Sequence, residues 1–258
     1  MSYNFFRIGV DNIKNISKGS IVTNNYNKKY RSEWKYLIRT QDMNVLKKNL
    51  DSLMELDSHT PATGRYIIHS LYFDNYTNES LLHNQAGTSK KYKWRIRYYG
   101  DDLSYIVLEK KEKQDGLGYK KSCKITLDEY KDIFFGNITD LAYDSDKPLI
   151  KELAADMLAK GFHPEVIIDY ERIAYVEEIT NVRITFDLKI SASYDLDEFL
   201  TGEYERFYIM PSDINLLEVK FDYILPSHIK MVLNLDKINQ TSFSKYYFGR
   251  KIIDRYIR

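Results

Sequence analysis

Alternation of apolar and polar residues along the chain predicts eight β-strands. Successive side chains of a strand point to opposite faces, so an apolar residue at every second position indicates a strand with one buried face. These runs occupy residues 31–38, 66–74, 91–99, 104–113, 119–127, 165–176, 181–193 and 215–223. The loop 114–118, which contains Asp115 and Gly116, joins two of them and is typical of a β-hairpin. Such short connections favour antiparallel pairing.

Helical periodicity predicts four helices, at 41–57, 146–161, 226–238 and from about residue 244 to the end. Pro148 lies near the start of the second helix and Gly161 at its end, which is the usual placement of these two residues. Eight antiparallel strands with few helices predict an α+β fold, an eight-stranded antiparallel β-barrel with peripheral helices. No linker or repeat divides the chain, so residues 1–258 are expected to form a single domain.

Arginine and lysine dominate the polar faces of six of these strands. In the stretch 93–97, Arg95 and Arg97 share one face and oppose Trp94 and Ile96. The same alternation places further charged residues on polar faces, namely Arg31, Glu33, Lys35, Glu109, Lys111, Lys113, Lys120, Lys124, Arg183, Asp187, Glu218, Lys220 and Asp222. For any one strand the ordinary interpretation is a sheet with one solvated face. Helices that covered the apolar faces from outside would instead turn the charges toward the interior of the barrel.

Cations enclosed in a barrel repel one another unless an anion lies among them. An eight-stranded barrel has room for side chains or one small ligand. A polyphosphate chain meets this requirement, because arginine makes bidentate contacts to phosphate oxygens and lysine supplies point charges. The glutamates of the same faces, Glu33, Glu109 and Glu218, are the predicted ligands of Mg²⁺ or Mn²⁺, which bind oxygen and bridge phosphates.

Composition excludes several other classes of site. The chain carries 38 Lys plus Arg and 37 Asp plus Glu, so the formal net charge of +1 gives no sign of nucleic-acid binding. Cys123 is the only cysteine, which rules out a disulfide framework and a cysteine-based zinc site. The five histidines show no metal-binding spacing, and no Gly-x-x-x-x-Gly-Lys-Ser/Thr loop is present. The N-terminal stretch lacks the apolar core of a signal peptide, which favours a cytoplasmic protein.

Seven short segments occur in the order found in VTC domains, the catalytic domains of the vacuolar transporter chaperone polyphosphate polymerases. They are SEWKYLI, SLYFD, KWRIRYYG, LEKKEK, NVRITFD, LLEVKFD and SFSKYYFG. The chain therefore resembles this family, within the CYTH-like or triphosphate tunnel metalloenzyme superfamily, over about residues 28–251. The resemblance implies a prokaryotic stand-alone member with a tunnel of eight antiparallel strands. It also implies metal-dependent transfer of the γ-phosphoryl group of ATP to a growing inorganic polyphosphate chain.

The resemblance also implies roles for individual residues. Arg95, Arg97, Arg183 and Lys245 are the expected catalytic residues, with Lys245 near the transferred phosphate, and Glu218 is the expected metal ligand. Together with Lys220, which shares the parity of Glu218, the expected substrate-binding cations are Lys35, Arg95, Arg97, Lys111, Lys124, Arg172, Arg183 and Lys245. The phosphoryl acceptor would be a phosphate oxygen, so no nucleophilic side chain is required.

Two positions depart from the expected pattern. Hydrolases of the superfamily open with Glu-x-Glu-x-Lys, whereas this chain has Arg31 at the first position and keeps only Glu33 and Lys35. Fewer acids give fewer metal ligands and less activation of water, which counts against a plain triphosphatase. Arg172 shares the parity of the apolar face of its strand, so either a β-bulge shifts it or it lies at the tunnel mouth.

Three functions stay open on the sequence alone: polyphosphate synthesis, hydrolysis of triphosphates, and non-catalytic binding of phosphate or polyphosphate. The acid-poor first strand favours synthesis over hydrolysis, and Glu218, Lys245 and the arginines favour catalysis over binding alone. The expected partners are ATP and inorganic phosphate or polyphosphate, and no nucleic acid is expected. No apolar run approaches the about 20 residues of a membrane span. A membrane channel that receives the product would therefore be a separate protein.

Overall fold

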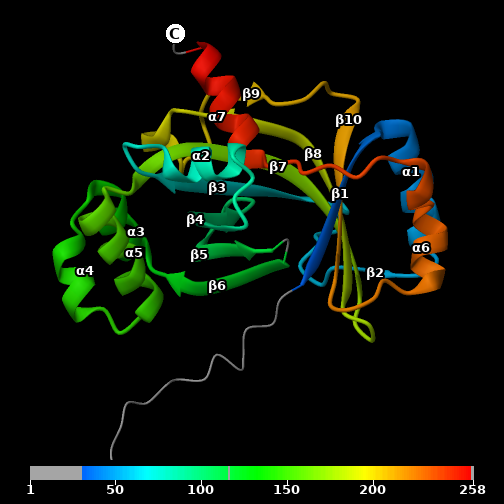
Figure 1. The fold of residues 1–258 in the computed structure, drawn as a ribbon, viewed down its shortest axis with the longest axis horizontal. Coiled ribbons are helices and arrows are strands. Elements are labelled where there is room, and N and C mark those ends of the chain that lie inside the picture. The colour runs from blue at the N-terminus through cyan, green and yellow to red at the C-terminus, as the bar shows by residue number, and fades with distance from the viewer. Residues whose placement is uncertain (1–30, 116, 257–258) are drawn as a thin grey trace, which may run out of the picture.

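One antiparallel sheet dominates the structure, a computed structural model that describes residues 31–115 and 117–256 (Figure 1). Within these residues the strands are β1 (Ser32–Arg39), β2 (Glu55–Leu56), β3 (Tyr66–Asp74), β4 (Lys90–Tyr99), β5 (Asp102–Gln114), β6 (Leu117–Ile125), β7 (His163–Glu177), β8 (Val182–Ser193), β9 (Phe207–Tyr208) and β10 (Ile214–Phe221). The helices are α1 (Thr40–Leu50), α2 (Glu79–Gln85), α3 (Leu127–Phe135), α4 (Ile138–Asp144), α5 (Pro148–Lys160), α6 (Ser227–Leu233) and α7 (Lys245–Tyr256), with 3₁₀ turns at Leu196–Glu198 and Leu235–Lys237. The predictions for the N-terminal stretch, for residues 28–30 and for Gly116 concern positions outside the described residues.

The eight long strands are neighbours in the order β1-β10-β8-β7-β3-β4-β5-β6, and every pair is antiparallel. The short strands β2 and β9 pair with β7 and β8. The α+β class and the eight predicted strands are thus confirmed, with ends shifted by a few residues. The register sets polar residues opposite one another, for example Lys35 opposite Glu218 and Arg95 opposite Glu109. Because side chains alternate with a period of two, this register puts these residues on one side of the sheet.

The prediction of a closed eight-stranded barrel is wrong, because the sheet does not close. The edge strands β1 and β6 share one isolated bridge, in which the backbone N–H groups of Arg31 and Gly118 donate to each other's carbonyls at 3.2 and 3.3 Å. Further along β1, the edge is occupied by residues 238–244, which we call the strap. The Thr241 N–H donates to the Lys35 carbonyl at 2.8 Å. Edge groups that are already hydrogen-bonded are not available for a second ladder.

Helices cover the outer side of the sheet in two places (Figure 1). The group α3, α4 and α5 packs on β4, β5 and β6, where Trp94, Ile96 and Leu108 are fully buried. The pair α1 and α6 packs over β1, β10 and β8, around Tyr36 and Phe186. The apolar sides of the strands therefore face these helices, and the polar sides face the other way. The predicted helices are confirmed in shortened form, whereas α2, α3 and α4 were not predicted.

The helix α7 packs on the face that carries the charges, at an end where that face becomes apolar. Tyr246 lies in one buried cluster with Ile168 and Ala192. Gly249 permits this close approach, since a Cβ there would lie 2.2 Å from Ile168 Cδ1 and 3.3 Å from Ala192 Cβ. The packing fixes the position of Lys245, the first residue of α7, beside the charged part of the face.

Candidate functional site

The polar sides of the strands form one inward side of the sheet, which we call the charged face. Contacts between strands that are not neighbours demonstrate the curl: Lys111 on β5 donates to Glu33 on β1 at 3.0 Å, and Arg183 on β8 donates to the Tyr66 hydroxyl on β3 at 3.2 Å. The cations on this face include Lys35, Lys91, Lys93, Arg95, Arg97, Lys111, Lys113, Lys120, Lys124, Arg172, Arg183, Lys220 and Lys245, and the buried or half-buried carboxylates among them include Glu33, Asp74, Glu109, Asp187 and Glu218. Such an excess of positive charge is suited to an anionic ligand.

Glu218 on β10 is the centre of the largest ion cluster. Its side chain is buried, and its carboxylate oxygens lie 2.8 Å from Lys245 Nζ, 3.2 Å from Lys220 Nζ, 3.3 Å from Lys35 Nζ and 3.5 Å from Arg172 Nη2. Burial alone would raise the pKa of Glu218, but these four cations hold the pKa well below its ordinary value. The ionised carboxylate therefore holds together cations from β1, β7, β10 and α7.

Arg172 lies in the same cluster, and neither explanation of its parity is correct. It stands directly opposite Tyr66 in a regular stretch of the β3–β7 ladder. The register shift lies on the β7–β8 side, where the extra residue belongs to β8 and Lys189 has a φ of 49°. Arg172 is buried and makes a bidentate pair with Asp187 at 2.6 and 2.7 Å. The inward side of β7 looks apolar in the sequence because α7 covers part of it.

Asp187 on β8 links Lys245 to Arg172 and was not among the predicted site residues. It is fully buried, and its Oδ2 lies 2.6 Å from Lys245 Nζ. Burial lowers the pKa of Lys245, but Asp187 and Glu218 outweigh burial and raise the pKa above its ordinary value. Lys245 is thus charged, and its Nζ lies 4.7 Å from the centre of the Tyr170 ring. The signal for Asp187 was present in the sequence, since it shares the parity of Arg183.

A second ion cluster forms around Glu109 on β5. Glu109 is buried and accepts hydrogen bonds from Arg95 Nε and Lys120 Nζ, both at 2.6 Å, while Arg97 Nη1 lies 4.0 Å away. Burial raises the pKa of Glu109, but Arg95, Arg97 and Lys120 lower it well below the ordinary value. Both arginines are therefore held by an ionised carboxylate from the neighbouring strand.

Tyrosine hydroxyls hold the arginines of the charged face, and the sequence analysis missed them. The pairs are Arg95 with Tyr72 at 3.0 Å, Arg97 with Tyr170 at 3.0 Å, and Arg183 with Tyr66 at 3.2 Å. Each tyrosine stands on a strand different from that of its arginine and shares the inward parity. A neutral acceptor orients a guanidinium without cancelling its charge, so the arginines stay available to an anion.

Glu33, Lys111 and Lys220 connect β1 with β5 and β10. Glu33 lies 3.0 Å from Lys111 Nζ and 3.3 Å from Lys220 Nζ. Burial raises the pKa of Glu33, but Lys111, Lys35 and Lys220 together bring it well below the ordinary value. Burial lowers the pKa of Lys220 from 10.5 to about 8, in spite of Glu218 and Glu33. Lys220 therefore titrates just above neutral pH.

Two of the predicted cations lie at the edges of the charged face. Arg183 is one-third exposed and is paired with Asp57 as well as with Tyr66. Lys124 is exposed, with its Nζ 5.7 Å from the centre of the Tyr105 ring. The structure thus gathers the other predicted cations around Glu218, Glu109 and Glu33 and leaves these two outside. The roles of all of them stay predictions.

The carboxylates of the charged face can be compared with the ligands that a divalent cation requires. Within the residues that the structure describes, no three His, Cys, Asp or Glu side chains gather into a ready-made metal site. Glu33 and Glu218 come near one another, because Lys35 and Lys220 each contact both. Mg²⁺ is commonly held by one or two carboxylates while water and substrate phosphates complete its shell. Glu33 and Glu218 fit that arrangement, whereas Glu109 belongs to the separate arginine cluster.

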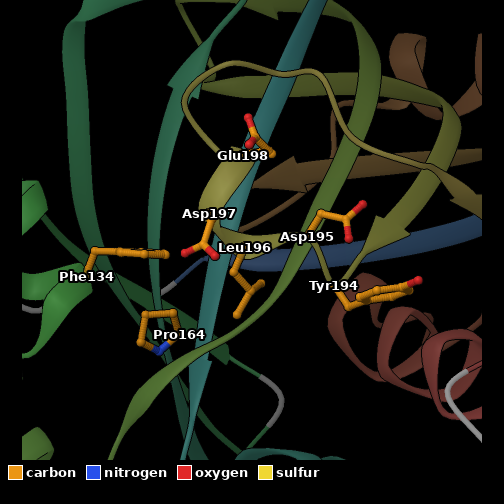
Figure 2. A pocket seen from close by; sticks show the side chains of 7 residues that line it. All are labelled: Phe134, Pro164, Tyr194, Asp195, Leu196, Asp197 and Glu198. Atoms are coloured by element: carbon orange, nitrogen blue, oxygen red, sulfur yellow. The ribbon is translucent and has the colours of Figure 1, made fainter.

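A pocket of about 550 Å³ lies away from these clusters (Figure 2). It is lined by Phe134, Pro164 and residues 194–198. Three of its side chains are carboxylates, those of Asp195, Asp197 and Glu198, and none of the charged-face cations lines it. The negative charge of these carboxylates would repel phosphate, so we assign the candidate site to the charged face.

Comparison with protein families decides the family of the chain. The family model of the VTC domain matches residues 30–253. The chain belongs to the VTC family. This confirms the resemblance seen in the sequence, and it makes the protein a member of a superfamily of phosphate-handling enzymes. A search of curated proteins found no match.

Several solved structures are similar to this VTC domain at low identity. A Bacillus halodurans protein provisionally named an adenylate cyclase has a TM-score of 0.45 and 14% identity, over 83% of this chain and 95% of that one. A conserved hypothetical protein of Pyrococcus furiosus has a TM-score of 0.41 and 14% identity, over 81% and 94%. The PH1012 protein of Pyrococcus horikoshii has a TM-score of 0.42 and 12% identity, also over 81% and 94%. Nothing about activity follows from similarity at this level. No described helix of this VTC domain combines the length and the apolar character needed to cross a membrane.

Proposed function

We propose that this VTC domain is a metal-dependent polyphosphate polymerase, which transfers the γ-phosphoryl group of ATP to the end of an inorganic polyphosphate chain. The observation that carries the proposal is the convergence of Lys245, Arg172 and Lys35 on buried Glu218, within one inward face of a VTC-family sheet. Phosphoryl transfer depends on positioning and charge stabilisation rather than on covalent help from the protein. Cations that are already fixed in place supply both.

The residues of the Glu218 cluster and of the Glu109 cluster would have different roles in the transfer. Lys245, charged and held at the start of α7, would neutralise the phosphoryl group in transit, and Arg95 and Arg97 would clamp the neighbouring phosphates. Arg183 and Lys124, at the edges of the face, would hold outer parts of the substrates. An oxygen of the acceptor phosphate forms a bond to the γ-phosphorus, the bond to the β–γ bridging oxygen breaks, and ADP leaves with that electron pair. The acceptor carries its own negative charge, so no side chain has to remove a proton.

A bound Mg²⁺ or Mn²⁺ would supply positive charge that neutralises part of the charge of the phosphates. Glu218 and Glu33 would hold it, with substrate phosphates as further ligands. Lys35 and Lys220, which contact both glutamates, would then be free to turn toward the phosphates. In this proposal the chain acts as one tunnel domain, because the strap and the Glu33–Lys111 pair span the gap that the ladder leaves open.

One assay separates the candidate functions. The purified protein is incubated with ATP and Mn²⁺ or Mg²⁺, and polymer on a gel is measured beside free phosphate. Polymer formation supports the proposal. Phosphate release without polymer would replace it with a triphosphatase, and tripolyphosphate binding without turnover would replace it with a binding module. We expect the reaction in the cytoplasm and any membrane channel for the product in another protein.

A further inference from the structure

Four lysines form a square of like charges on the charged face. In the β4–β5 ladder, Lys91 stands directly opposite Lys113, and Lys93 stands directly opposite Lys111. One residue separates the two pairs on each strand, so all four side chains leave the same face. Directly opposite side chains begin only about 4.5–5.5 Å apart, and like charges in that position destabilise a sheet. We call these four residues the lysine square.

Carboxylates neutralise little of the charge of the lysine square. Lys111 pairs with Glu33 at 3.0 Å. Lys93 instead donates to neutral oxygens, Asn84 Oδ1 at 3.2 Å and Ser244 Oγ at 3.0 Å. Within the described part of the chain, no ion pair joins a carboxylate to Lys91, Lys93 or Lys113.

The environment of Lys91, Lys93 and Lys113 opposes their protonation. Burial lowers the pKa of Lys91. Burial, aided by Lys35, Lys111 and Lys91, also lowers the pKa of Lys113, although Glu33 acts in the opposite direction. Burial, Lys111, Lys35 and Lys91 bring the pKa of Lys93 well below its ordinary value, and they outweigh the opposing effect of Asp74. Arg95 and Arg172, by contrast, each have a carboxylate partner at 2.6 Å. Within the described residues, the lysine square is thus a part of the charged face in which most cations have no carboxylate partner.

We propose that the lysine square binds the growing polyphosphate chain behind its reacting end. The identity of this ligand rests on the proposed polymerase function. The square lies next to the proposed reaction centre, because Lys93 contacts Ser244, the residue before Lys245. From there it runs outward to Lys91, which is half-buried, and Lys113, which is exposed. A chain with its end at Lys245 would therefore leave past the start of β4 and the end of β5.

The test removes the outer pair of the square in the variant Lys91→Gln/Lys113→Gln. Its matched control, Lys48→Gln/Lys131→Gln, removes two lysines from α1 and α3. Calorimetry without metal measures the binding of tripolyphosphate and of a polyphosphate several tens of phosphates long. For the variant we expect at least ~10-fold weaker binding of the long chain, the scale of one charge-assisted contact, and less than ~3-fold weaker binding of tripolyphosphate. The control should bind both as the parent does.

Thermal melts and product length complete the test. The melting temperature of the ligand-free variant should equal or exceed that of the parent, since two repelling charges are removed. In the synthesis assay the variant should make shorter polymer than the parent and the control. An equal loss of affinity for both chain lengths, no loss for the long chain, or a parent that binds no polyphosphate would overturn the inference. A parent that makes no polymer would defeat the polymerase proposal, and the length dependence of binding would still decide the role of the square.

Discussion

Glu218 has four cationic partners, so its replacement changes the charge balance of the cluster as well as removing the proposed metal ligand. In Glu218→Gln we expect metal-dependent turnover to fall at least ~100-fold, the scale of losing one preorganised group. The melting temperature should also fall, because buried cations lose their countercharge. Tripolyphosphate in the absence of metal should bind at least as tightly as to the parent. Turnover with Mn²⁺, thermal melts and calorimetry measure these three effects.

The control for this variant is Glu152→Gln. Glu152 pairs with Lys110 at 2.7 Å and with Lys121 at 2.8 Å on the helix-covered side of the sheet. Its loss should lower the melting temperature and leave turnover unchanged. Parent-like turnover in Glu218→Gln would remove Glu218 from the site.

Arg95 and Arg97 should differ in their contributions to stability. Arg95→Ala removes a 2.6 Å partner of buried Glu109, so it should lower both turnover and melting temperature. Arg97→Ala removes a cation that bonds the Ser70 and Tyr170 hydroxyls and lies 4.0 Å from Glu109, so the melting temperature should change less. Turnover should fall at least ~100-fold in both variants. An equal fall in melting temperature in the two variants would contradict the conclusion that Arg95, rather than Arg97, is the main partner of Glu109.

The lowered pKa of Lys220 predicts opposite effects of pH on tripolyphosphate binding and on the stability of the fold. Its pKa of about 8 means that the charged face loses a cation as the pH rises through that value, so the affinity for tripolyphosphate should fall. In the unfolded chain the lysine keeps its proton up to its ordinary pKa of 10.5, so the unfolded state binds more protons between these values. The free energy of unfolding should therefore rise over that interval. Both trends, followed by calorimetry and by denaturant unfolding, should weaken in Lys220→Gln, and profiles identical to the parent's would point to another group.

At the scale of elements, the alternation of apolar and polar residues was sufficient to predict the strands. It did not identify the inward side of a strand where a helix covers that side. Six of the predicted strands, namely β1, β4, β5, β6, β8 and β10, have a helix on one side and charges on the other, so each side left a clear pattern. On β7 the inward side carries Ile168, Tyr170 and Arg172, since α7 packs against part of it. Parity therefore misplaced Arg172. The strap and the single bridge between Arg31 and Gly118 depend on contacts distant in sequence, which local periodicity does not contain.

The candidate site was predictable in its cations and less so in their partners. Parity found Lys35, Lys220 and the β4 arginines because each lies on a strand with a clean apolar side. Parity placed Asp187 on a polar face, but it gave no reason to prefer Asp187 or the tyrosines over other residues of the strands, since tyrosine is common in strands. These residues could be selected only once the curl of the sheet was known. The curl brings Tyr66 on β3 within hydrogen-bonding distance of Arg183 on β8, although β3 and β8 are not neighbours in the sheet.

The docking of α7 predicts an effect of Gly249→Ala on both fold and activity. The added Cβ would lie 2.2 Å from Ile168 Cδ1, and overpacking of this kind costs about 1–3 kcal/mol. The shift of α7 would withdraw Lys245 from Asp187, so turnover should fall together with the melting temperature. Ile168→Val removes the clashing Cδ1, and the double variant should recover most of both losses. A double variant no better than Gly249→Ala would contradict this explanation.

At the scale of the molecule, a covalent link can test whether the gap between β1 and β6 must open. Arg31 and Gly118 exchange both backbone hydrogen bonds, and the Cα atoms of such a pair lie about 5.5 Å apart, within the range for a disulfide. Oxidised Arg31→Cys/Gly118→Cys should melt at a higher temperature than its reduced form and make polymer at a similar rate, because the product is expected to leave along the strands. Synthesis that stops on oxidation and returns on reduction would mean that the gap opens in each cycle. The oxidised parent, with Cys123 alone, is the control.

The pairing of β1 with β10 has a consequence for biosynthesis. Ser32 lies opposite Phe221, so the first strand has no ladder partner until the ribosome has made most of the described chain. The β4–β5–β6 meander joins neighbours in sequence and can form early, whereas pairing over so long a separation is slow. The packing around Trp34 and Tyr36, which α1 begins, is complete only when β10 and α6 have been made. Lys245 follows later still, so an incomplete nascent chain has no assembled charged face and cannot bind the proposed ligands, ATP and polyphosphate, before its fold is finished.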